Sequence, residues 1–209
     1  MSRIIAGAAG GSSLFSVPGD GTRPTTDRVK EALFSRLESY GILQEARVLD
    51  LFAGSGALGV ESASRGAAAV DLVELADKPA ATCRQNAELV NKILGRTCVS
   101  VHRAKAETFL LRVPADVRWD VVFIDPPYAF TEAELATVLT PLAGHLADGA
   151  VVVLERSTRS PEPVWPEGLE RFSERKYGET TLWFAEPADG DAESGDAESG
   201  DGETEAAQA

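Results

Sequence analysis

The stretch "VLDLFAGSGALGVE" (residues 48–61) decides the fold. Its apolar first part is typical of a buried strand and its last part of a helix. Gly54, Gly56 and Gly59 have G-x-G-x-x-G spacing, which permits a tight turn and a close approach of a ligand to the backbone. Glu74 follows Gly54 by twenty residues, at the end of the next predicted strand, where a carboxylate can accept hydrogen bonds from a ribose diol. We therefore predict a parallel α/β sheet that binds an adenosine-containing ligand at its first turn.

Strand-like and helix-like segments alternate along the chain around this turn. The predicted strands span residues 46–52, 68–75, 97–103, 119–125 and 149–156. The predicted helices span residues 25–41, 56–66, 77–94, 106–113 and 131–146. Such alternation is typical of a mostly parallel sheet with helices on both faces. Residues 169–186 instead predict two strands joined by "KYGE", an antiparallel hairpin that completes a sheet of seven strands.

The composition divides the chain into three predicted parts. Residues 1–24 contain two short β-type runs and predict an N-terminal β-hairpin extension. Residues 25–186 carry the α/β domain. Residues 187–209 repeat Gly, Asp, Ala, Glu and Ser without a large apolar side chain, so we expect a disordered acidic tail.

The formal net charge of −13 argues, for the chain taken whole, against a nucleic-acid partner. This charge is not evenly spread, because residues 186–209 hold nine acidic side chains and no basic one. Residues 1–185 hold 24 acidic and 20 basic side chains, a net charge of −4. The tail therefore supplies most of the imbalance.

The two cysteines, Cys83 and Cys98, form no CxxC pair and predict neither a disulfide framework nor a metal site. A reducing compartment fits this usage. The N-terminus lacks the apolar run of a signal peptide, and no segment is long and apolar enough to span a membrane. We expect a cytoplasmic protein without a membrane partner, and a monomer by default.

Two features favour S-adenosylmethionine over a nicotinamide dinucleotide as the ligand of the glycine turn. Asp50 ends the first strand, where its carboxylate could lie near the ammonium or sulfonium group of S-adenosylmethionine but would repel a pyrophosphate. The fourth strand ends in "VVFIDPPYAF" (121–130), which hydride transfer does not need. A dinucleotide-dependent oxidoreductase stays open as an alternative at this point.

Asp125, Pro126, Pro127 and Tyr128 form a stiff turn at the end of that strand. Each proline fixes its own φ and holds the residue before it extended, so the Asp125 carboxylate and the Pro126 carbonyl point in set directions. Two fixed acceptors suit a planar NH₂ group, because they can orient its nitrogen lone pair toward a methyl donor. Tyr128 could stack on a nucleobase, a contact worth about 1–3 kcal/mol.

The first predicted helix and the segment before it, "RPTTDRVKEALF" (23–34), are rich in basic side chains. These basic residues are Arg23, Arg28, Lys30 and Arg36. An arginine at such a place can bind a phosphate or a carboxylate bidentately. Thr25 and Thr26 could cap the helix or reach the methionine end of the ligand.

Together these stretches resemble the RsmD-like family of S-adenosylmethionine-dependent amino-methyltransferases. The resemblance rests on "RIIAG" (3–7), "RPTTDRVKEALF" (23–34), "LDLFAGSGALGVESASRGA" (49–67) and "FIDPPY" (123–128). It implies a Rossmann-like class I methyltransferase fold, S-adenosylmethionine as cofactor and methylation of N2 of one guanine in 16S rRNA. The implied partner is 16S rRNA in the small ribosomal subunit or in an assembly intermediate, with no metal in the reaction.

The resemblance also implies roles for individual residues. The cofactor-binding residues would be Asp50, Phe52, Ala53, Gly54, Gly56, Glu74 and Ala106, the last through its backbone N–H. The catalytic residues would be Asp125, Pro126, Pro127 and Tyr128. The residues in contact with RNA would be Arg3, Arg23, Thr25, Thr26, Arg28 and Tyr128. We expect Asp125 to orient the amine more than to deprotonate it, on a base that is splayed out of its stack.

Other functions stay open on the sequence alone. An adenine-N6 DNA methyltransferase or a protein glutamine methyltransferase would use the same chemistry, although no segment is long enough for a separate DNA-reading domain. An NAD-dependent oxidoreductase would leave Asp125 without a role. A non-catalytic RNA-binding module for ribosome assembly would keep the cofactor pocket, and its biological effect would survive Asp125→Ala.

Overall fold

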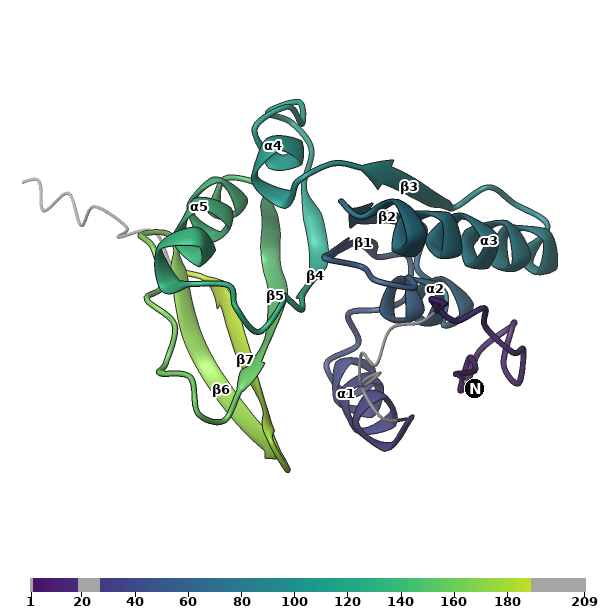
Figure 1. Cartoon of the computed structure of the whole chain (residues 1–209), viewed down its shortest axis with the longest axis horizontal. Helices are drawn as coiled ribbons and strands as arrows, with labels where there is room; N and C mark the ends of the chain where they lie inside the picture. The colour runs from purple at the N-terminus through teal and green to yellow at the C-terminus, as the bar shows by residue number, and fades with distance from the viewer. Residues whose placement is uncertain (1, 19–26, 189–209) are drawn as a thin grey trace, which may run out of the picture.

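The computed structural model describes residues 2–18 and 27–188 and contains a seven-stranded sheet. The strand order is β3-β2-β1-β4-β5-β7-β6 (Figure 1). The strands are β1 (Arg47–Leu51), β2 (Ala69–Glu74), β3 (Val99–Arg103), β4 (Trp119–Ile124), β5 (Leu146–Ser157), β6 (Leu169–Tyr177) and β7 (Thr180–Pro187). The first five strands are parallel, and β7 is antiparallel to both β5 and β6. The predicted Rossmann-like sheet with a C-terminal antiparallel hairpin is thereby confirmed.

Five helices of the described chain cover the two faces of this sheet (Figure 1). They are α1 (Asp27–Ser39), α2 (Ala57–Ser64), α3 (Asp77–Leu94), α4 (Ala106–Leu110) and α5 (Glu132–Ala143). One apolar core joins the sheet to α1, α2, α3 and the N-terminal segment, and a second core joins the opposite face to α4 and α5. No helix in the described ranges has the length and apolar character needed to cross a bilayer.

Some helix and strand boundaries differ from the predicted ones, and pairing between strands explains the difference at β5. The predicted and observed bounds of α3 agree, because Gly95 adopts a left-handed φ of 66° and ends the helix. The helix α4 ends at Leu110 instead of residue 113, and β5 begins at Leu146 instead of residue 149. The early start of β5 follows from a pair between Leu146 and Trp119, which is separated by a register shift from the rest of the β4–β5 ladder.

The N-terminal segment (residues 2–18) is less regular than the β-hairpin that we expected. It doubles back on itself, but its ladder is a single antiparallel bridge between Arg3 and Ser13. Backbone bonds also join its arms, among them those from Ile4 N to Ser12 O at 3.0 Å and from Gly11 N to Ile4 O at 2.8 Å. The N–H groups of Ile5 and Ala6 instead donate to the Glu61 carboxylate on α2, at 2.7 and 3.1 Å. Ile4, Ala9 and Leu14 are buried in the same core as α1, so the segment is an integral part of the main core.

Lys30 lies in the core and not on the basic surface where the sequence had suggested it. Its side chain is 2% exposed, and its Nζ donates to the carbonyl of Arg3 at 2.6 Å and lies 3.7 Å from Glu61. Burial lowers the pKa of Lys30, and the negative charge of Glu61 opposes that shift. Glu61 also accepts a hydrogen bond from Arg65 at 2.8 Å, and Arg65 pairs with Glu38 at 2.8 Å, so two cations face two carboxylates in this network.

Candidate active site

The two predicted loops meet at the carboxyl edge of the sheet. Leu51 at the end of β1 pairs in register with Ile124 at the end of β4, and the strands are direct neighbours. The glycine turn (residues 52–56) follows Leu51, and the proline turn (residues 125–130) follows Ile124. Both turns therefore leave the sheet at the same level. In open α/β sheets this edge is where ligands bind.

The glycine turn (residues 52–56) has an unusual backbone. Gly54 and Gly56 have φ values of 57° and 79°, and Phe52 has a φ of 62°. A left-handed non-glycine residue costs about 1–3 kcal/mol, and such residues cluster at functional sites. Ala53 donates from its N–H to Val73 O at 3.0 Å and accepts from Gly56 N at 2.6 Å, which ties the turn to β2.

Glu74 holds the glycine turn from the end of β2. One carboxylate oxygen accepts from Gly54 N at 2.9 Å, and the other accepts from Ala76 N at 2.8 Å. Each oxygen keeps a lone pair beyond that bond, because a carboxylate has about four acceptor sites. Glu74 is half-buried, and its acceptors are fixed in place by backbone donors.

Asp50 lies beneath the glycine turn. It is 2% exposed, and its Oδ2 accepts from Gly59 N in the first turn of α2 at 3.0 Å. Burial raises the pKa of Asp50 to about 7, the Gly59 hydrogen bond opposes this shift, and the nearby charge of Glu74 adds to it. Asp50 therefore changes its charge close to neutral pH. The Cys83 thiol, which donates to Gly54 O at 3.1 Å, is buried beside it, and burial raises the pKa of that thiol.

The proline turn presents an acid and an aromatic ring at the same edge. Pro126 is buried, and the turn closes with a 2.8 Å hydrogen bond from Phe130 N to Pro127 O. Tyr128 is 88% exposed. A ring that stacks on a ligand would have such an exposed face in the protein without the ligand. The described structure therefore brings the four predicted catalytic residues (Asp125, Pro126, Pro127 and Tyr128) beside the glycine turn.

Asp125 has a surface that water can reach, yet the protein surrounds it closely enough to remove much of its hydration. This desolvation raises the pKa of Asp125 well above its usual range, and the negative charges of Glu155 and Asp50 raise it further. A carboxylate with a raised pKa is a strong hydrogen-bond acceptor. This electrostatic setting suits a group that must hold an amine.

Two residues that the sequence reading missed anchor the proline turn. The Phe130 ring contacts the Phe52 ring, with centroids 5.1 Å apart. Arg156 donates to Phe130 O at 3.1 Å and to the Glu132 carboxylate at 2.5 Å. The only signal in the sequence was a basic residue at the end of a predicted apolar strand. Arg156 is 9% exposed, so it fixes the exit of the turn from inside the protein.

Asn86 on α3 joins the glycine turn to the N-terminal segment, and it was also missed. Its Oδ1 accepts from Phe15 N at 2.9 Å. Its Nδ2 donates to Phe15 O at 3.1 Å and to Ser55 O at 2.8 Å. The Asn86 side chain is fully buried, and its three hydrogen bonds are partly buried.

The remaining predicted site residues lie on other elements or outside the described chain. Ala106 is the first residue of α4, a helix without a side-chain cap, and it is buried. Arg3 and Arg28 are exposed, on the N-terminal segment and on α1. Arg23, Thr25 and Thr26 lie outside the described residues.

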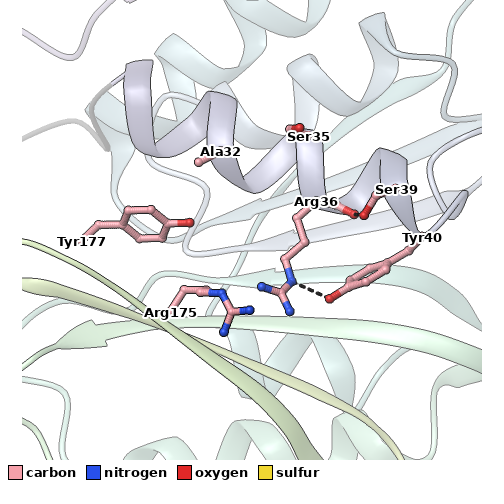
Figure 2. Close-up of a pocket in the computed structure, with 7 residues that line it drawn as sticks. All are labelled: Ala32, Ser35, Arg36, Ser39, Tyr40, Arg175 and Tyr177. Carbon is pink, nitrogen blue, oxygen red and sulfur yellow. Dashed lines mark hydrogen bonds between the residues drawn. The ribbon is translucent and has the colours of Figure 1, made fainter.

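Away from the glycine turn, residues of the described chain line two hollows. One, of about 390 Å³, lies between α1 and β6 and is shown in Figure 2. The other, of about 230 Å³, is lined by residues that include Arg47, Asp71, His102 and Trp119. In the second hollow Asp71 accepts from the Trp119 indole at 3.0 Å and lies 2.9 Å from His102, which fits a structural role for that histidine.

The chain is similar to known proteins over most of its length. The family model described as "Conserved hypothetical protein 95" matches residues 2–186. The chain belongs to this family. Ribosomal RNA small subunit methyltransferase D from Haemophilus influenzae is 35% identical over 176 residues, which cover 84% of this chain and 89% of that protein. The protein of the same name from Escherichia coli K12 is 32% identical over 193 residues, which cover 92% and 93%.

The chain is also similar to proteins of solved structure. A putative methyltransferase, yhhF, from Escherichia coli matches with a TM-score of 0.74 and 33% identity, over 89% of this chain and 97% of that one. The resemblance to the RsmD-like family, drawn from four blocks of sequence, is thus confirmed over most of the chain.

Proposed function

We propose that this protein transfers a methyl group from S-adenosylmethionine to the exocyclic N2 amine of a guanine in 16S rRNA of the small ribosomal subunit. The observation that carries the proposal is the register pair between Leu51 and Ile124, which sets the glycine turn beside the Asp125–Tyr128 turn. The relatives named as small subunit rRNA methyltransferases support the choice of substrate.

The residues of the glycine turn fit an adenosine-containing cofactor. Glu74 offers two fixed acceptors that suit a ribose diol, and the left-handed turn at Phe52, Gly54 and Gly56 leaves the backbone open to a ligand. An ideal Cβ on Gly54 would meet nothing within 4 Å, so this position faces open space that a ligand could fill. We assign Asp50, Phe52, Ala53, Gly54, Gly56, Glu74 and the backbone N–H of Ala106 to cofactor binding.

When bound, S-adenosylmethionine would supply the electrophilic methyl group. The amine nitrogen of the base would take that methyl group, S-adenosylhomocysteine would leave, and the proton of the alkylated nitrogen would pass to water. Asp125 and the Pro126 carbonyl accept from the two amine hydrogens and orient the lone pair, which is catalysis by positioning and electrostatics. Tyr128 stacks on the splayed base.

The exposed arginines Arg3 and Arg28 would hold RNA phosphates, together with Arg23, Thr25 and Thr26 of the segment before α1. An oxidoreductase is not favoured, because hydride transfer gives the Asp125–Tyr128 turn no task. The DNA and protein amino-methyltransferase alternatives share the reaction and differ only in the acceptor. The identity of the methylated product therefore separates them.

The direct test is methyl transfer from labelled S-adenosylmethionine to small subunits isolated from cells that lack this protein, followed by nucleoside mass spectrometry. We expect label in N2-methylguanine with the wild-type protein and a loss of at least about 100-fold with Asp125→Ala, the scale of removing one group that stabilises the transition state. Asp116→Ala is the matched control, because Asp116 is an exposed acid in the loop before β4. Label in another nucleoside would mean that a different base accepts the methyl group. Label in protein alone would contradict the assignment of RNA as the substrate. Full biological effect of Asp125→Ala would support a non-catalytic module.

A further inference from the structure

The hollow between α1 and β6 has a distinct chemical character (Figure 2). Six polar or aromatic residues line it: Ser35, Arg36, Ser39 and Tyr40 from the α1 side, and Arg175 and Tyr177 from β6. None of the residues that line it is acidic, although the whole chain has a net charge of −13. This hollow is therefore a local cationic surface on an acidic protein.

The two guanidinium groups of the hollow lie close together. Figure 2 shows them side by side, and both reach the same hydroxyl, because Ser173 Oγ lies 3.0 Å from Arg36 and 3.5 Å from Arg175. Their other hydrogen-bond partners are neutral. Arg36 donates to the Tyr40 hydroxyl, and Arg175 donates to the Glu174 carbonyl at 2.7 Å. Within the described chain neither forms an ion pair with a carboxylate. Two positive charges that share one hydroxyl partner repel each other, and an anion bound between them would relieve the repulsion.

The Arg36 guanidinium is held rigidly by aromatic rings. It lies 4.8 Å from the centroid of Phe184 and 5.5 Å from that of Tyr40. Such stacking fixes the plane of the guanidinium, so its remaining donors are preorganised for a phosphate. Tyr40 is 42% exposed and offers a ring face at the rim of the hollow. Arginines with exposed tyrosines are the side chains that RNA-binding surfaces use for phosphates and unstacked bases.

The sheet register places this hollow at the level of the proline turn. Arg175 on β6 pairs with Leu182 on β7, and Leu182 pairs with Glu155 on β5. Glu155 follows Leu154, which pairs with Ile124 of β4, the residue just before Asp125. Asp125 and Arg175 therefore lie in one row, three strand spacings apart, or about 14 Å.

The hollow also opens on the face of the sheet that α1 covers. Leu182 belongs to the core on that face, and residues that pair across two antiparallel strands project to the same side. The Arg175 side chain therefore projects toward α1, where Arg36 lies. A strand of RNA whose target base enters the site at Asp125 would pass this hollow.

We propose that the hollow of Arg36, Tyr40, Arg175 and Tyr177 binds the phosphodiester backbone of the RNA substrate a short distance from the target nucleotide. This inference rests on the proposed function and adds a binding surface to it. It differs from the predicted contacts at Arg3, Arg23 and Arg28, none of which is among the described residues that line the hollow.

The test uses the full chain and small subunits from cells that lack the protein. Arg175→Gln removes an exposed charge without opening the core, and Arg112→Gln is the matched control, an exposed arginine that lines the other hollow. For Arg175→Gln we expect KM for the subunits to rise about tenfold, with kcat and the affinity for S-adenosylmethionine unchanged. The slope of log KM against log salt should fall by about 1, the signature of one lost phosphate contact. Arg175→Glu should raise KM further.

The outcomes separate the inference from the proposed function. If the wild type methylates the subunits while Arg175→Gln and Arg112→Gln show the same KM and the same salt slope, the hollow does not bind RNA and the proposed function stands. A raised KM with an unchanged salt slope would point to contact with a ribosomal protein and would also overturn the inference. If the wild type transfers no methyl group to RNA, the proposed function fails and the inference fails with it.

Discussion

The Phe52 ring meets the Phe130 ring edge to face, with centroids 5.1 Å apart and an angle of 71° between the ring planes. Phe52 belongs to the glycine turn and has a left-handed backbone, whereas Phe130 closes the proline turn. The pair is therefore a direct contact between the element proposed for the cofactor and the element proposed for the target base.

This contact gives the first prediction. Phe130→Ala removes an aromatic contact that stabilises by about 0.5–1.5 kcal/mol in addition to the burial of apolar area. It also removes the direct contact between the glycine turn and the proline turn. We expect a higher KM for S-adenosylmethionine and a lower kcat, because the two sites lose their fixed separation. Steady-state kinetics with small subunits measure both. Phe109→Ala is the control, since Phe109 is also partly buried and contacts two rings, those of His102 and Trp119. Equal kinetic effects of the two variants would contradict the role given to the pair.

A second prediction concerns Asn86. In Asn86→Asp the amide donor is replaced by an oxygen that faces the carbonyls of Phe15 and Ser55, and the buried group gains a charge. We expect a lower melting temperature and weaker binding of S-adenosylmethionine by calorimetry. Asn91→Asp is a close control, because Asn91 on the same helix bonds the backbone of Cys98 and Val99, away from the glycine turn. Both variants should lose stability, but only Asn86→Asp should lose cofactor affinity. Unchanged affinity of Asn86→Asp for S-adenosylmethionine would show that the glycine turn keeps its shape without the hydrogen bond from Asn86.

A third prediction uses the buried carboxyl of Asp50. Its pKa in the folded protein is about 7, above the ordinary value of 3.8, so the folded state binds its proton more tightly than the unfolded state. The stabilisation from this group is complete below about pH 4 and is lost as the pH rises to about 7. In Asp50→Asn a neutral oxygen can still accept from Gly59 N. The variant should therefore gain stability over the wild type as the pH rises from 4 to 7, by a few kcal/mol at most, at about 1.4 kcal/mol per pKa unit.

Urea unfolding of the full chain at several pH values checks the Asp50 prediction. Asp148→Asn, a change at an exposed aspartate, should follow the wild type at every pH. A difference between Asp50→Asn and wild type that does not vary with pH would mean that Asp50 is not the titrating group. Binding of S-adenosylmethionine to the same variant tests whether Asp50 contacts the ligand: a loss of affinity is expected if its charge faces the ammonium group.

A fourth prediction concerns the pH dependence of activity. The pKa of Asp125 is raised by desolvation and then by the charge of Glu155, and the carboxylate form is the better acceptor for an amine. Activity should therefore fall on the acid side at a pH above the ordinary titration range of an aspartate. Glu155→Gln removes one negative neighbour, which lowers the pKa of Asp125 and moves the acid limb of kcat/KM to lower pH. Glu170→Gln, at an exposed residue of β6, should leave the limb in place. Coincident profiles for all three proteins would rule out this coupling.

The sequence predicted those parts of the site whose chemistry is local. The glycine turn and the Asp125–Tyr128 turn each lie within a few residues, and the parallel sheet brings them together by a general rule. The burial of Lys30 was not predictable in this way, because its partners are the carbonyl of Arg3 and the side chain of Glu61. Local composition describes a basic helix there, whereas the tertiary fold places one of its charges in the core.

The anchors of the site were missed for the same physical reason. The bonds of Asn86 and Arg156 join segments far apart in sequence, 71 residues for Asn86 and Phe15 and 26 for Arg156 and Phe130. The residues next to Asn86 give no sign of these bonds, and for Arg156 the one sign is its place at the end of an apolar strand. The hollow at Arg36 was equally hidden, because its other half comes from β6, and Arg36 and Ser173 are 137 residues apart.

The attachment of the N-terminal segment to α2 and α3 has a consequence for folding during translation. Ile5 and Phe15 leave the ribosome early, yet their partners Glu61 and Asn86 are made 56 and 71 residues later. At about 5–20 residues per second, the segment waits about 3–14 s with its apolar side chains uncovered. Its docking must close a long loop before any bond rewards it, so it comes late on the folding pathway. The first residues to be synthesised are thus among the last to fold, and a nascent chain that is short of α3 still exposes them to chaperones and proteases.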